Sequence, residues 1–314
     1  MPTKKVISIK SSTDELKLFA NIYIPDAQPK AVVQIIHGMA EHKERYEQLC
    51  LTLAKCGYVT IIADNRGHGK SVNDDIVLGY FAKENGWLVN LQDIHNFSLY
   101  IREKYRNLPF FVIGHSMGSL IGHSYLKRYE DIVDGIIFSG MPAYNNATNF
   151  GKSLATFFKK GKGAKKCNKI LISASDYNKA YKHPRTPFDW LSYNEENVDK
   201  YVADPLCGYP FTNSGMYDLL DGMQDVYQRK DWRILKKELP ILFIAGKDDL
   251  CADVPKGFNY ALNNLASAGY NNIKANIYQD MKHEIFNEND KITVYKDVIK
   301  WLDEQLKLRA NSIK

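Results

Sequence analysis

Five short apolar runs alternate along this chain with stretches of helical periodicity, and this alternation constrains the fold more than any other feature. Glycines punctuate the runs, which lie at residues 31–38, 59–69, 109–114, 133–140 and 239–246. Continuous apolar runs of this kind are typical of strands that are buried on both faces. We therefore predict an α/β fold, in which helices flank a mostly parallel central sheet on both sides.

The alternation stops between residues 142 and 232, where lysine, asparagine, tyrosine and proline are frequent. We predict that this stretch, here called the inserted segment, forms a mainly helical lid above the sheet. It would divide the core into residues 1–141 and 233–314. Two strand-like stretches before the first run predict an N-terminal hairpin. Residues 275–283 predict a last strand, which precedes a C-terminal amphipathic helix.

Composition and cysteine usage narrow the class of protein. No apolar run reaches the length of about 18 residues that predicts a transmembrane helix, and the N-terminus lacks the apolar core of a secretory signal. The cysteines are odd in number and include no Cys-x-x-Cys pair, namely Cys50, Cys56, Cys167, Cys207 and Cys251. This pattern argues against a disulfide scaffold or a zinc site, and it favours a reducing, cytoplasmic location.

The sequence Gly-His-Ser-Met-Gly at residues 114–118 ends one of the apolar runs and opens a helical stretch. In that context Gly-x-Ser-x-Gly is typical of a nucleophile elbow, a sharp strand-to-helix turn that exposes the serine. Such a serine needs a base, a carboxylate that orients the base, and donors for the oxyanion. Ser116 is therefore the predicted nucleophile. The alternative is a glycine-rich turn with an incidental serine.

The base and the acid are expected later in the chain, in the order serine, acid, histidine. His283 comes after the run Ala275–Tyr278 of the predicted last strand and is the candidate base. Two adjacent acids, Asp248 and Asp249, compete at the end of the preceding apolar run. We favour Asp249, because a Gly-x-x-Asp turn would bring its side chain over the end of the strand.

The oxyanion donors are expected to be backbone N–H groups, so the side chains at these positions matter little. One donor belongs to Met117, the residue after the nucleophile, and the other to Met39, in the loop after the first apolar run. Acyl transfer at such a site requires neither a metal ion nor an organic cofactor.

Five motifs resemble those of the monoacylglycerol lipase and lysophospholipase branch of the α/β-hydrolases: HGMAEH, DNRGHGKS, GHSMGS, GKDD and MKHEIFNE. The inserted segment adds RTPFDWLS and ADPLCGYPFTNSGMYDLL, which are similar to the lid of bacterial lysophospholipases. The resemblance implies the catalytic and oxyanion residues already named, Ser116, Asp249, His283, Met39 and Met117. It implies a scaffold role for Asp64 and Arg66. Ala40 departs from the family, where glycine is frequent, and alanine is tolerated there if its φ is negative.

The activity that the resemblance implies is hydrolysis of the acyl ester of a single-chain lipid, a monoacylglycerol or a lysophospholipid, through an acyl-serine intermediate. A short-chain carboxylesterase and a peptidase of the proline-aminopeptidase type are the alternatives. The peptidase would need carboxylates to hold the substrate amine, for which Glu195, Glu196 and Asp199 are candidates, although they resemble a solvated helix face. A non-catalytic binding protein is disfavoured, because every member of the triad is present.

The positive charge of the chain is concentrated in the inserted segment. Residues 143–190 contain ten Lys or Arg and two Asp or Glu, and residues 151–169 hold seven lysines and no acid among Leu154, Phe157 and Phe158. One interpretation is a lid that transiently contacts an anionic membrane surface, or that attracts a phosphate-bearing substrate. The alternative is a solvated lid whose aromatic residues pack on the core. No motif supports nucleic-acid binding.

Overall fold

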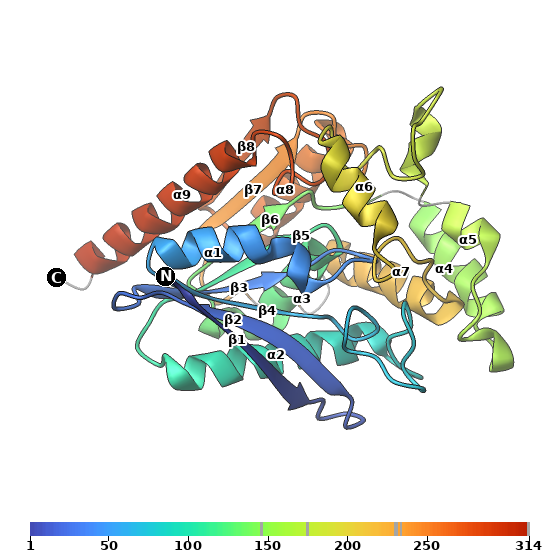
Figure 1. The fold of residues 1–314 in the computed structure, drawn as a ribbon, viewed down its shortest axis with the longest axis horizontal. Coiled ribbons are helices and arrows are strands. Elements are labelled where there is room, and N and C mark those ends of the chain that lie inside the picture. The colour runs from blue at the N-terminus through green and yellow to red at the C-terminus, as the bar shows by residue number, and fades with distance from the viewer. Residues whose placement is uncertain (145–146, 174–175, 229–231, 233, 313–314) are drawn as a thin grey trace.

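The computed structural model describes residues 1–144, 147–173, 176–228, 232 and 234–312. An eight-stranded sheet crosses the molecule in the order β1-β2-β4-β3-β5-β6-β7-β8 (Figure 1). The strands are β1 (Thr3–Lys10), β2 (Lys17–Ile24), β3 (Ala31–Ile36), β4 (Tyr58–Ala63), β5 (Phe110–His115), β6 (Gly135–Ser139), β7 (Ile241–Gly246) and β8 (Ile273–Tyr278). β2 pairs antiparallel with β1 and with β4, and every other neighbouring pair is parallel. The predicted α/β fold and N-terminal hairpin are confirmed.

The two faces of the sheet are covered by different helices. α1 (Glu47–Lys55) and α9 (Lys291–Ser312) bury their apolar sides in one core cluster. α2 (Gly86–Lys104), α3 (Met117–Tyr129) and α8 (Lys256–Ala268) contribute to the cluster on the other face. β3 to β7 are buried along their whole length, which explains their continuous apolar sequences. β8 lies at the edge, is largely exposed, and begins two residues before the predicted start.

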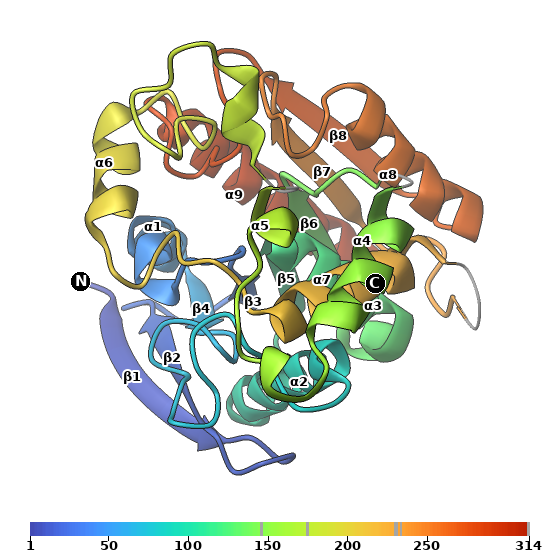
Figure 2. The same ribbon diagram turned by 90° about the vertical axis from the view of Figure 1, so that its right-hand side faces the viewer.

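The described part of the inserted segment is mainly helical. It contains α4 (Ala147–Phe158), α5 (Lys169–Ser173), α6 (Glu195–Ala203) and α7 (Asn213–Tyr227). These helices gather at one end of the sheet, and Figure 2 looks onto them with α4, α5 and α7 in front of the strands. Among the described residues, no helix combines the length and apolar character needed to cross a bilayer.

Candidate active site

Ser116 occupies a strained backbone position between β5 and α3. Its φ is 53° and its ψ is −121°, a conformation that residues with a Cβ adopt rarely and at a cost of roughly 1–3 kcal/mol. The backbone N–H of Ser116 donates to the carbonyl of Ser139 on β6 at 2.8 Å, which anchors the turn to the neighbouring strand. The turn therefore has the geometry of the predicted nucleophile elbow, and Ser116 as a whole is 8% exposed.

The two glycines of the motif permit the close approach of α3 to the sheet. A Cβ on Gly114 would lie 2.3 Å from the carbonyl oxygen of Gly118, and a Cβ on Gly118 would lie 2.0 Å from the carbonyl oxygen of Ile36. Neither space admits a side chain. The N-terminus of α3 is thereby seated directly against the ends of β3 and β5, and Met117 is its first residue.

Asp249 and His283 form a buried pair beside this turn. The ring Nδ1 of His283 donates to both carboxylate oxygens of Asp249 at 3.0 Å. Asp249 also accepts from the backbone N–H groups of Cys251 at 2.9 Å and Ala252 at 3.0 Å, so its orientation is fixed. Asp248 instead accepts from the hydroxyl of Tyr193 at 3.0 Å. The structure thus brings Asp249, and not its neighbour, to the histidine.

The electrostatics of this pair suit a proton acceptor. Burial alone would lower the pKa of His283, but the charge and hydrogen bond of Asp249 outweigh it and raise the pKa above 6.5. Burial works in the opposite sense on Asp249, and His283 more than offsets it, so the pKa of the carboxyl is lowered. The ring of His115 lies 4.8 Å from that of His283, and burial lowers the pKa of His115 to about 4. His115 therefore stays neutral beside the pair.

Ser116 and His283 line the same cavity, together with Met39 and Met117. Cys251 lines the cavity as well, and burial raises the pKa of its thiol. Among the described residues, no hydrogen bond joins the hydroxyl of Ser116 to His283. Such bonds commonly tighten only when substrate is bound. The structure therefore places all four predicted groups around one cavity.

The loop from Gly38 to His42 is held by its own glutamate. Glu41 accepts from the N–H of Gly38 at 2.6 Å and from the hydroxyl of Tyr46 at 2.7 Å. Ala40 has a φ of +51°, so the condition under which alanine was expected to be tolerated there, a negative φ, is not met. The strain is tolerated because the Ala40 carbonyl accepts two hydrogen bonds from the inserted segment, from Gly208 N–H and the Tyr201 hydroxyl, both at 2.9 Å.

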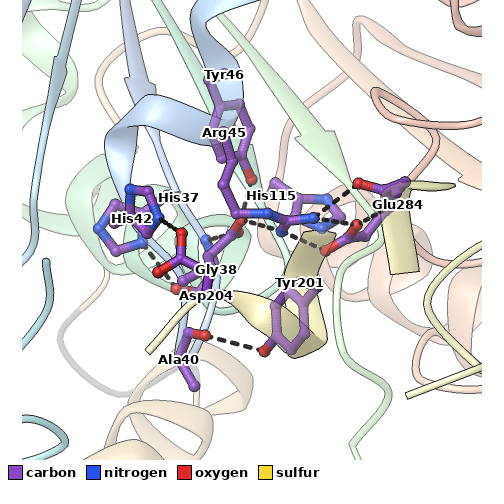
Figure 3. A network of polar contacts seen from close by, with 12 residues as sticks. His37, Gly38, Ala40, His42, Arg45, Tyr46, His115, Tyr201, Asp204 and Glu284 are labelled. Carbon is purple, nitrogen blue, oxygen red and sulfur yellow. Dashed lines mark hydrogen bonds and ion pairs between the residues drawn. The ribbon is translucent and has the colours of Figure 1, made fainter. Parts of the chain in front are cut away.

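A buried ion-pair network behind the site was not predicted. Arg45 donates to both oxygens of Glu284 at 2.5 and 2.6 Å (Figure 3). It also donates to Glu41 at 2.7 Å and to Asn197 of α6 at 3.0 Å. Burial would raise the pKa of Glu284, but Arg45 outweighs it and lowers the pKa to about 2. The network joins the loop before α1, the residue after His283, and the inserted segment.

The cavity has a volume of about 1140 Å³ and two kinds of wall. Its apolar wall comes from the inserted segment and includes Leu171, Met216, Leu219, Leu220 and Met223. Trp190, also of the inserted segment, lies over the base, with ring centroids 5.0 Å from those of His283. The RTPFDWLS stretch contained this tryptophan, but nothing in its spacing indicated a place beside the histidine.

The remaining candidate residues lie away from the cavity. Glu195, Glu196 and Asp199 are exposed on α6, where Glu196 pairs with Lys200 at 2.6 Å and Asp199 with Arg185 at 2.5 Å. Asp64 binds Lys43 at 2.6 Å, and Arg66 binds Asp93 at 2.7 Å; all four are buried. None of the three α6 acids, nor Asp64 or Arg66, is among the residues that line the cavity.

Comparison with known proteins assigns the family. A family model described as serine aminopeptidase, S33, matches residues 27–290. A monoacylglycerol lipase of Mycolicibacterium smegmatis is 26% identical over 298 residues, which is 93% of this chain and 94% of that protein. The human monoglyceride lipase is 28% identical over 303 residues, which is 94% of this chain and 89% of that protein.

The fold has equally clear counterparts. A crystal structure of a thermostable carboxyl esterase from Bacillus coagulans, in complex with glycerol, superposes with a TM-score of 0.88 at 25% identity. The superposition covers 97% of this chain and 99% of the esterase. The resemblance found in the motifs is confirmed, and the chain belongs to the serine aminopeptidase S33 family of α/β-hydrolases.

Proposed function

We propose that this protein hydrolyses the acyl ester of a single-chain lipid, a monoacylglycerol or a lysophospholipid. The observation that carries the proposal is the meeting of a strained Ser116 and a buried Asp249–His283 pair at the wall of a large, mainly apolar cavity. The names of the mycobacterial and human relatives support the ester class.

In the proposed mechanism His283 removes the proton of Ser116 as the hydroxyl attacks the ester carbonyl. Asp249 orients the imidazole and stabilises the imidazolium that forms. The N–H groups of Met39 and Met117 bind the oxyanion of the tetrahedral intermediate. His283 then passes its proton to the departing alcohol, and a water molecule attacks the acyl-serine by the same sequence of proton transfers. No step draws on a metal ion or an organic cofactor.

The apolar wall supports a long acyl chain over a short one. The side chains from α5 and α7 enclose a space far larger than an acetyl group needs. Each methylene that leaves water contributes about 0.8 kcal/mol to binding, so a cavity of this kind favours longer acyl groups. The inserted segment would act as the lid that brings this wall over the ester.

The family description makes an aminopeptidase the second candidate function. An aminopeptidase holds the charged amine of its substrate, which calls for free carboxylates at the cavity. Of the described residues, three acids line the cavity: Glu41 and Glu284 are both engaged by Arg45, and Asp176 accepts from the backbone N–H of Asn178 at 3.2 Å. The exposed acids of α6 do not line it. The geometry therefore favours the ester over the aminoacyl amide.

We further propose that the inserted segment contacts an anionic lipid surface transiently. Its exposed large apolar side chains include Phe150, which is 73% exposed, and Phe157, which is 67% exposed. The lysines of residues 151–169 surround them in the sequence, and lysines beside exposed aromatic residues are typical of interfacial segments. The five free cysteines support a reducing, cytoplasmic compartment.

The test is a comparison of p-nitrophenyl esters from acetyl to palmitoyl, followed by monoacylglycerol, lysophosphatidylcholine and an aminoacyl p-nitroanilide. We expect kcat/KM to peak at medium or long chains and the anilide to be a poor substrate. Activity confined to acetyl and butyryl esters would make the protein a short-chain carboxylesterase. Faster cleavage of the anilide than of any ester would establish the aminopeptidase.

A further inference from the structure

Three side chains with metal-ligand chemistry meet where the loop after β3 touches the inserted segment. The ligand atoms of His42, Asp204 and Cys207 all lie within 4.8 Å of one another. His42 Nε2 and the carboxylate of Asp204 are 2.8 Å apart, and Figure 3 shows them directed at each other. His42 is 7% exposed and Cys207 8% exposed, while the side chain of Asp204 is 32% exposed and opens the group to solvent.

The donor set matches one class of ion. Imidazole nitrogen, carboxylate oxygen and thiolate sulfur are the three ligand types that tetrahedral Zn²⁺ accepts in proteins. Bond lengths of about 2.0–2.3 Å place ligand atoms of a zinc site roughly 3.3–3.7 Å apart. In this structure His42 and Asp204 are 2.8 Å apart, and no two of the three ligand atoms are more than 4.8 Å apart. Side-chain rotations would therefore bring all three atoms to bonding distance of one ion.

Two of the three ligands are held in place by their own backbone. Asp204 and Cys207 belong to one turn, in which the N–H of Cys207 donates to the carbonyl of Asp204 at 2.9 Å. The second carboxylate oxygen of Asp204 accepts from the N–H of Leu206 at 2.8 Å, which orients the first oxygen toward His42. Supporting hydrogen bonds of this kind are typical of the residues around metal ligands.

We propose that His42, Asp204 and Cys207 bind a Zn²⁺ ion, with water in the fourth position. Binding releases the thiol proton of Cys207 to the buffer, and His42 ligates through Nε2 with its proton on Nδ1. The carboxylate and the thiolate then balance the charge of the ion. Arg45, whose charge acts on both Asp204 and Cys207, is already paired with Glu41 and Glu284. The sequence argued against a zinc site because the cysteines form no Cys-x-x-Cys pair. It could not indicate this group, because His42 lies 162 residues before Asp204 in the chain.

The site would act as a clamp on the cavity. The same two stretches of chain are already joined at Ala40, whose carbonyl accepts from Gly208 and Tyr201, and Met39 precedes Ala40 in the loop that carries the proposed oxyanion donor. A metal ion bound by His42 and Cys207 would add a second link between the loop after β3 and the inserted segment. We expect bound zinc to raise Tm and to slow turnover of long-chain esters, because the inserted segment is held more firmly.

The direct test is titration of the metal-free full chain with Co²⁺, which reports a cobalt–thiolate bond by absorption in the near-ultraviolet. One equivalent of Co²⁺ should develop this band, and Zn²⁺ should abolish it. The experiment is made on the Ser116→Ala background, so its outcome does not depend on the proposed esterase activity. Circular dichroism verifies the fold of each variant.

Three variants test the ligands, and two control for other thiols. Cys207→Ser should remove the thiolate band, and His42→Asn and Asp204→Asn should weaken Co²⁺ binding at least tenfold. Cys56→Ser and Cys167→Ser, which change exposed free cysteines elsewhere, should leave the titration unchanged. A band that persists in Cys207→Ser, or no band in the parent protein, overturns the proposal. Equal binding by His42→Asn and the parent also overturns it.

Discussion

The sheet and the inserted segment hold their residues in place by different means. β3 to β7 are completely buried, and they fix Ser116, Asp249 and the loop after β3 through close backbone contact. The inserted segment buries Phe211, Met216 and Val226 in the core cluster, but it leaves Phe150 and Phe157 exposed and adds polar contacts to the core. Among them, Glu288 accepts from Tyr193 N–H of the segment and from Lys282 N–H of the core, both at 2.9 Å.

This difference suggests a division between the two tasks of the proposed enzyme, which are ester chemistry and selection of the acyl group. Apolar burial is strong and non-directional, so it suits a framework that must not move. The polar contacts that the inserted segment adds can be exchanged with water at low net cost, since a typical one contributes only about 0.5–1.5 kcal/mol. In the proposed mechanism the chemistry belongs to the sheet framework, and we propose that the inserted segment, which supplies the apolar wall of the cavity, selects the acyl group.

The largest expected effect tests the framework at its nucleophile. Ser116→Ala should reduce kcat/KM for a p-nitrophenyl ester by roughly 10⁵–10⁶-fold, because no other group can form the acyl intermediate. Labelling by a fluorophosphonate should disappear with it. Ser153→Ala, on the exposed side of α4, is the control and should keep full activity. Residual activity within tenfold of the parent would remove Ser116 from the mechanism.

The acid of the pair gives the next effect. Asp249→Asn should lower kcat by about 10⁴-fold, because the amide favours the wrong tautomer of His283. Asp248→Asn is the matched control, since its carboxylate contacts only the hydroxyl of Tyr193 in the described structure and should change kcat less than threefold. Equal losses in the two variants would contradict the assignment of Asp249.

The junction of the two regions is tested through its buried ion pair. Glu284→Gln should lower the free energy of unfolding by about 3–5 kcal/mol, because Arg45 keeps its charge and loses a bidentate partner. Urea unfolding measures the change, and Glu196→Gln, which breaks an exposed pair, should cost less than about 1 kcal/mol. The lowered pKa of Glu284 means that its contribution is present above pH 4.5 and is lost as pH falls toward 2.

The pH profile of the framework gives a smaller effect. His283 must be neutral to accept a proton, and its pKa is raised above 6.5. The acid limb of kcat/KM should therefore have its midpoint above pH 6.5, with activity lost as pH falls through it. Titration of His115, with its pKa of about 4, should not shift the midpoint of this acid limb. A midpoint below pH 6 would show that Asp249 does not act on the base as described.

The smallest effect probes the exposed face of the inserted segment. Phe157→Ser should weaken binding to vesicles of anionic phospholipid by up to about tenfold, as expected from the loss of part of one aromatic side chain's burial. Hydrolysis of a soluble ester should not change. Leu308→Ser, an equally exposed apolar residue on α9, is the control. Loss of vesicle binding in the control alone would place the contact elsewhere.

Much of the framework could be predicted from the sequence, because its signals are local. Apolar runs identify strands that are buried on both faces, and the glycines around Ser116 identify a turn that excludes side chains. The choice of Asp249 over Asp248 rested on the Gly-x-x-Asp turn that begins at Gly246, and in the structure it is Asp249 that contacts His283. In each case the residues that determine the geometry are neighbours in the chain.

The contacts between regions could not be predicted in this way. Arg45 and Glu284 are 239 residues apart, and neither residue type indicates which opposite charge it will meet. The positive φ of Ala40 also depends on distant residues, because donors from Tyr201 and Gly208 hold its carbonyl. The position of Trp190 over His283 follows from the path of the whole inserted segment, which has no alternating pattern to indicate it.

Gly118 is the point at which helix α3 packs directly against the backbone that leads into the oxyanion loop. A single added carbon there would meet the carbonyl oxygen of Ile36 at 2.0 Å and that of His37 at 2.8 Å, and these residues lead directly into Gly38 and Met39. The helix that carries one proposed oxyanion N–H and the loop that carries the other therefore rest against each other across an absent side chain. A larger residue at position 118 would push the helix and the loop apart, and we expect it to increase the distance between the two proposed donors.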